Sequence, residues 1–160
     1  MNATLKKALG LNRPRLSLFI VACGIVGHFV FPRYVVATGS MVPTIPPGSF
    51  VVACRSSLLP MPIGKDDVAV FAPVAQISYA PWIHRIVANS GEKITPPVRK
   101  GRVDVSSGAR ALHTNETTES LVVPDGFFYQ SGDSATSYHG LVPKEIIIGK
   151  VLFHFKLPWR

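Results

Sequence analysis

Residues 38–48 read TGSMVPTIPPG and mark the point where an apolar segment ends and a strand-rich region begins. Ser40 lies near the start of this stretch, and Pro43 fixes the backbone just after it. The pattern predicts a loop that presents the Ser40 hydroxyl. A serine in a glycine- and proline-rich loop is also ordinary turn chemistry, so this stretch alone does not assign a function.

The segment before this loop is almost wholly apolar from Leu16 to Phe31, and it can continue past Arg33 to Ala37. About 20 apolar residues are needed to cross roughly 30 Å of hydrocarbon. We therefore expect a membrane anchor over residues 16–37. A cleavable signal peptide is the main alternative, but its removal would cut away or expose the loop that carries Ser40.

The net charge of +8 is concentrated around the apolar segment. Five basic and no acidic residues occur up to position 33: Lys6, Lys7, Arg13, Arg15 and Arg33. The positive-inside rule then places residues 1–15 in the cytoplasm and residues 38–160 on the extracytoplasmic side of the inner (plasma) membrane. The other tight basic group, at 99–102, has no interleaved aromatic side chains, so no nucleic-acid partner is expected.

Short β-rich runs separated by glycine and proline follow from Ser49 onward, and no later stretch has helical periodicity. We expect strands at 50–53, 68–71, 83–88, 121–123, 127–130 and 146–155. The polar segment 95–118 is expected to be an inserted loop or hairpin. The sequence therefore predicts a mostly β domain behind one helix.

The histidines are scattered along the chain, and its two cysteines, Cys23 and Cys54, fall inside and outside the apolar segment. No group of these residues has the spacing of metal ligands. We expect no metal site, no cofactor and no disulfide bridge.

Two further motifs follow the Ser40 loop. The first is WIHRIV at 82–87 with SGE at 90–92, and the second is YQSGDSATSYHG at 129–140, continuing into LVP at 141–143. Together with the SMVPT of residues 40–44, these motifs resemble, in identity and order, those of the type I signal peptidases (peptidase family S26). Their order is more specific than any one of them.

The resemblance implies an antiparallel β catalytic domain and a serine endopeptidase. Ser40 matches the nucleophile, and His84 stands where most of the family has a lysine base, as in the endoplasmic-reticulum branch. A histidine with an unperturbed pKa of about 6.5 suits a base near neutrality. Thr38 and the Ser40 N–H match the oxyanion hole. Either Asp133 or Ser137 is expected to orient His84, because the second acidic residue of the family's third motif is missing.

The implied activity is cleavage of signal peptides or leader segments from membrane-bound preproteins, with the lipid bilayer as the other partner. A relative that matures a pilin precursor during conjugation is an alternative within the family. A catalytically inactive, membrane-anchored β binding module is the alternative from another class. The missing lysine and the shortened third motif favour that module, whereas the retained Ser40 and His84 oppose it.

Overall fold

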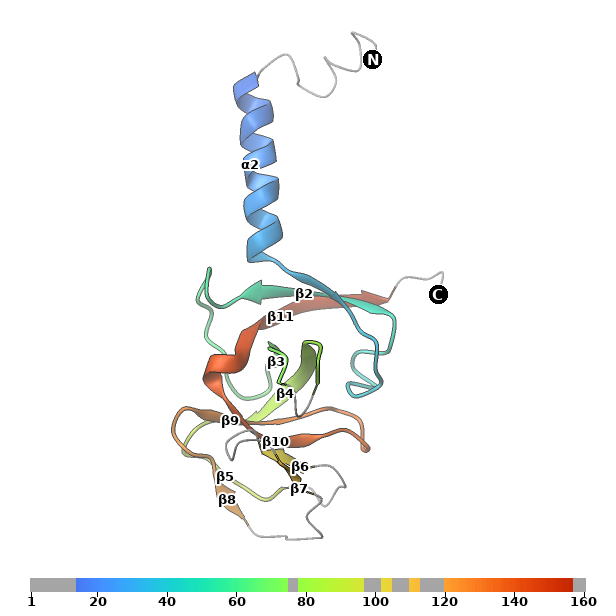
Figure 1. Cartoon of the computed structure of the whole chain (residues 1–160), viewed down its shortest axis with the longest axis vertical. Coiled ribbons are helices and arrows are strands. Elements are labelled where there is room, and N and C mark those ends of the chain that lie inside the picture. Colours follow the sequence, from blue (N-terminus) through green and yellow to red (C-terminus); the bar gives the residue numbers. More distant parts are fainter. Residues whose placement is uncertain (1–13, 75–77, 97–101, 105–109, 113–119, 157–160) are drawn as a thin grey trace.

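The computed structural model describes residues 14–74, 78–96, 102–104, 110–112 and 120–156. One α-helix projects from one end of a domain built of strands (Figure 1). The elements that build the main part of the sheet and its helix are α2 (Pro14–Val30), β1 (Arg33–Val35), β2 (Ser49–Arg55), β3 (Val68–Phe71), β4 (Trp82–Ala88), β9 (Phe127–Ser131), β10 (His139–Pro143) and β11 (Ile147–Lys156).

These strands form a sheet in the order β1-β2-β11-β3-β4-β9-β10-β6-β7, where β6 is Arg102–Asp104 and β7 is Arg110–Leu112. All neighbours pair antiparallel except β10 and β6. A second, two-stranded sheet pairs β5 (Lys93–Ile94) with β8 (Leu121–Val122), and a 3-10 turn, η2 (Lys144–Ile146), leads into β11. The mostly antiparallel β fold is confirmed.

Two regions differ in detail from what the sequence predicted. Strand β10 and the short strands β1 and β5 were not expected. The described parts of the expected insertion at 95–118 include the β6–β7 hairpin, and the rest of it lies outside the described residues.

Helix α2 ends earlier than the expected anchor. It stops at Val30, whereas the anchor was expected to run to residue 37, and residues 33–35 form β1, paired antiparallel with β2. Pro32 explains the change, because a proline disfavours helical backbone at the residue before it. Within the described residues, no helix combines the length and apolar character needed to span a bilayer.

The loop between β1 and β2 is tied into the domain core. Its ends are joined by hydrogen bonds from the Val36 N–H to the Ser49 carbonyl and from the Gly48 N–H to the Val36 carbonyl. Met41 and Ile45 are fully buried in one cluster with Val36. Burying a side chain of this size stabilises a fold by about 1.5–3 kcal/mol, so the Ser40 loop is fixed by its own apolar residues.

The close contact between β11 and β2 gives a test of this packing. A Cβ at Gly149 would lie 2.1 Å from the Cys54 carbonyl oxygen, a backbone atom that cannot rotate away. We expect Gly149→Ala to lower the free energy of unfolding by about 1–3 kcal/mol. Thermal or denaturant unfolding in detergent measures this loss.

Gly64→Ala is the matched control, because the nearest atom to its Cβ belongs to the Asn89 side chain, 3.4 Å away. Equal unfolding midpoints for the two variants would contradict the packing described between β2 and β11.

Candidate active site

Ser40 lies in the turn that follows β1, immediately before the buried Met41. Ser40 itself is half-buried, and Thr38 is exposed. The Thr38 Oγ1 atom lies 3.4 Å from the Ser40 Oγ atom. The loop therefore holds two hydroxyl groups side by side at the surface, on a backbone that the core keeps in place.

His84 lies on β4, between β3 and β9. His84, Ile86 and Ala88 are buried, and the residues between them are half-buried, as expected when alternate side chains point to opposite faces. Ile86 is paired with Gln130 of β9, so His84 and Gln130 are diagonal neighbours on the same face. Only 5% of the His84 surface is exposed.

Both ring nitrogens of His84 have partners. Nδ1 is hydrogen-bonded to the Gln130 amide oxygen, and Nε2 lies 3.2 Å from the Ser137 Oγ atom. An amide oxygen can only accept, so Nδ1 carries the proton and Nε2 is the acceptor. The Ser137 hydroxyl therefore donates to Nε2. This tautomer is the one that a general base needs at Nε2.

Gly132 brings the three motifs together. The register of β4 and β9, continued by one residue, places Gly132 opposite His84. A Cβ at Gly132 would lie 1.9 Å from the Ser137 Oγ atom and 2.4 Å from the Ser40 carbonyl oxygen. The Ser134 N–H also donates to that carbonyl oxygen, at 2.9 Å. The Ser40 backbone and the Ser137 side chain thus share the space left by the missing side chain.

Ser40 and His84 are brought into the same site but are not directly bonded. Among the hydrogen bonds of the described residues, His84 Nε2 contacts Ser137 and not Ser40. Catalytic hydrogen bonds in unliganded enzymes are often long and tighten when substrate binds. Ser137 is in a position to orient His84, which was one of the two possibilities open from the sequence.

Asp133, the other possibility, has a different partner. Its carboxylate accepts two hydrogen bonds from Arg85, at 2.9 Å to Nε and 2.7 Å to Nη2. Arg85 also donates to the Asp66 carbonyl oxygen, at 2.8 Å. Both ring nitrogens of His84 are bonded to Gln130 and Ser137, so the Asp133 carboxylate accepts from Arg85 and not from His84. Gln130 and Arg85 were not anticipated as partners.

Burial controls the protonation of this site. Desolvation lowers the pKa of His84 to about 4, although the Gln130 hydrogen bond and the Asp133 charge both act to raise it. For Asp133, burial would raise the pKa of the carboxyl, but hydrogen bonds from Arg85 and Thr44 and the guanidinium charge outweigh it and lower that pKa. At neutral pH the site holds a neutral imidazole beside a compensated ion pair.

No three histidine, cysteine, aspartate or glutamate side chains converge to hold a metal ion within the described ranges. The chemistry that this arrangement supports with its own residues is proton transfer at Nε2, which contacts the Ser137 hydroxyl and lies across Gly132 from the Ser40 backbone.

The lowered pKa of His84 predicts an acid-sensitive fold. An unfolded chain would protonate His84 near pH 6.5, whereas the folded chain does so near pH 4. The unfolded state thus binds more protons between these values, and stability falls as pH drops from about 6.5 to about 4. NMR titration of the His84 ring, identified by its absence in His84→Gln, should give a midpoint near 4. A midpoint at or above 6.5 would contradict the burial described here.

The comparisons agree with the geometry. Residues 13–156 match the sequence model of the family described as signal peptidase, peptidase S26. No curated protein matches the chain. The match spans most of the chain and includes Ser40, His84 and the loop that carries Asp133 and Ser137. The chain therefore belongs to the signal peptidase family, peptidase S26.

Proposed function

We propose that this signal-peptidase-type protein is a membrane-anchored serine endopeptidase in which Ser40 is the nucleophile and His84 is the general base. The observation that carries the proposal is the buried, neutral His84, whose acceptor nitrogen faces the loop bonded to the Ser40 backbone. A neutral imidazole can take the proton from a serine hydroxyl without first losing one of its own.

Two serines are candidates for the nucleophile: Ser137 contacts His84 directly, and the Ser40 backbone lies against Gly132, opposite His84. Burial distinguishes them. Ser137 is only 5% exposed, so a scissile carbonyl would have to displace packed residues to reach it. Ser40 is half-buried in a surface loop, and its hydroxyl turns about a single side-chain bond. We therefore assign the attack on the scissile carbonyl to Ser40, which turns toward Nε2 as the substrate binds.

The Ser137 hydroxyl can change from hydrogen-bond donor to acceptor toward Nε2 during this step. Its hydroxyl lies 3.2 Å from Nε2 and 3.4 Å from the Tyr138 carbonyl oxygen. When Nε2 receives the Ser40 proton, the Ser137 hydroxyl can donate to Tyr138 and accept from the new Nε2–H. His84 then returns the proton to the leaving amine.

The oxyanion formed by this attack needs donors near Ser40. The Thr38 hydroxyl lies beside the Ser40 hydroxyl, and we assign it to the oxyanion hole with the Ser40 N–H. Removal of one such donor typically costs about 10² to 10³-fold in rate.

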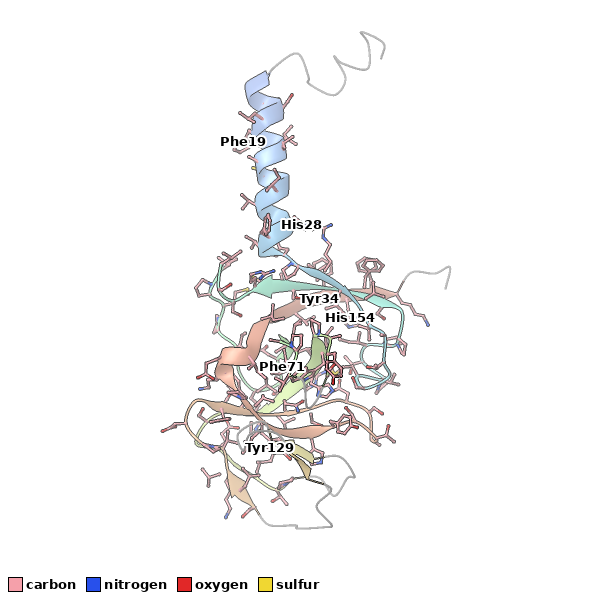
Figure 2. The ribbon with its side chains drawn as sticks, in the orientation of Figure 1. Phe19, His28, Tyr34, Phe71, Tyr129 and His154 are labelled. Carbon is pink, nitrogen blue, oxygen red and sulfur yellow. The ribbon has the colours of Figure 1, made fainter. Side chains whose placement is uncertain are left out.

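Membrane attachment is part of the proposal and rests on surface chemistry. Helix α2 exposes most of its large apolar side chains, Phe19 among them, outside the domain (Figure 2). At the end of the domain where α2 enters, β11 exposes Phe153 and Phe155, and Phe155 stacks on Phe50 of β2. Apolar surface of this extent is typical of a membrane or partner contact. We propose that α2 with its flanking residues anchors the chain and that the aromatic end faces the bilayer.

The substrates proposed are membrane-bound preproteins cut near a signal or leader segment, with pilin precursors as one possible class. The contact between His84 Nε2 and Ser137, rather than Ser40, favours the second candidate, an inactive binding module. Kinetics of point variants separate the two.

We expect Ser40→Ala to abolish cleavage of a preprotein, because it removes the attacking oxygen and little packing. His84→Ala should lose about 10² to 10⁴-fold in kcat/KM. The matched control is Lys93→Ala, which removes an exposed side chain on β5 and should be nearly silent. Cleavage of preprotein in a reconstituted membrane measures all three. Undiminished turnover by Ser40→Ala would support the binding module.

For topology, we expect protease added outside intact spheroplasts to digest residues after Ser40, because the basic residues precede the apolar segment. Protection of that region from outside, with digestion from the cytoplasmic side, would reverse the proposed orientation.

A further inference from the structure

Gln130 is a buried amide at the base of the site. It lies on β9, is 2% exposed, and hydrogen-bonds through its amide oxygen to His84 Nδ1. Its place follows from the sheet, because its pairing with Ile86 sets it on the face to which His84 points. A buried polar side chain costs stability unless it is bonded, so this contact accounts for the amide buried on β9.

The Asp133 carboxylate does not accept the hydrogen bond from His84 Nδ1. Asp133 is held by the two-pronged contact with Arg85, and its remaining side-chain bond is to Thr44. The residue paired with His84 on the other neighbouring strand is Ala69 of β3, which has no charge. Among the described residues, the charge that acts on His84 is therefore that of Asp133, offset by Arg85.

We infer that Gln130 is the positioning residue of this site: it holds the proton of His84 on Nδ1 through a neutral acceptor and so directs the unprotonated Nε2 toward Ser137 and the Ser40 loop. The inference rests on the proposed function for its catalytic meaning, because it assigns the residue that orients the proposed base. Its structural content, the choice of tautomer, does not depend on cleavage.

A neutral orienter has a different consequence from a carboxylate. A carboxylate on Nδ1 stabilises the imidazolium, whereas an amide oxygen bonds the neutral ring without a full charge. Burial keeps His84 deprotonated into mildly acidic conditions, and the amide opposes this effect of burial less than a full negative charge would. A carboxylate introduced at position 130 should reverse this, because its charge raises the pH at which the ring takes up a proton.

The test uses two variants of the full chain in detergent or vesicles. Gln130→Glu keeps an acceptor and adds charge, and Gln130→Leu removes the acceptor. The matched control is Tyr129→Phe, which removes a different buried hydrogen bond on β9, between the Tyr129 hydroxyl and His139 Nδ1. Imidazole ¹⁵N NMR reads the tautomer and the titration midpoint of His84, and preprotein cleavage gives the pH profile of kcat/KM.

We expect Gln130→Glu to keep the Nδ1–H tautomer and to move both the His84 midpoint and the acidic limb of kcat/KM upward by at least about one pH unit. Gln130→Leu should lose the tautomer preference and at least about tenfold in kcat, with KM little changed. Tyr129→Phe should leave the His84 signals as they are. If Gln130→Leu does not fold, the Gln130→Glu titration decides alone.

The inference is overturned if Gln130→Glu leaves the His84 midpoint and the pH profile where they are in the parent, or if folded Gln130→Leu keeps the parent tautomer. This failure is distinct from failure of the proposed function. NMR reads His84 without substrate, whereas the proposed function fails when Ser40→Ala still cleaves.

Discussion

The site depends on the absence of a side chain at Gly132. Gly132 follows the last residue of β9 and lies opposite His84. The space that a Cβ would fill there holds the Ser137 hydroxyl and the Ser40 carbonyl oxygen. Any larger residue would push the Ser40 loop and Ser137 away from the imidazole. Three motifs spread over residues 40–143 therefore meet at one point, because Gly132 has no side chain to occupy it.

The rest of the fold holds that point rigid. The buried side chains of Met41 and Ile45 pack into the core and hold the Ser40 loop in place. The sheet holds His84 on β4, between β3 and β9. The Arg85–Asp133 ion pair joins the strand that carries His84 to the loop after β9. Such a partly buried pair contributes more to geometry than to stability. The polar contacts set the relative positions of the site residues. The three apolar clusters supply most of the stability of the folded domain.

Much of this arrangement could be predicted from sequence, and the remainder has physical reasons for being missed. The Ser40 loop, the strand face of His84 and the long last strand follow from local pattern. Tyr34 and Val35 fit a helix or a strand equally, so their sequence does not distinguish β1 from the end of the predicted anchor. The Arg85–Asp133 and His84–Gln130 contacts depend on the register of β4 against β9, which local spacing does not determine. The polar Gln130 within a predicted strand was the one available signal.

We propose Ser40, rather than the more buried Ser137, as the nucleophile that His84 activates. A phosphonylating serine-reactive probe, followed by peptide mapping with mass spectrometry, tests it most directly. We expect modification of Ser40 to rise as His84 loses its proton, with a midpoint near pH 4, and to be strongly reduced in His84→Ala. Modification of Ser137 in place of Ser40, or equal labelling of Ser40 in His84→Ala, would contradict it.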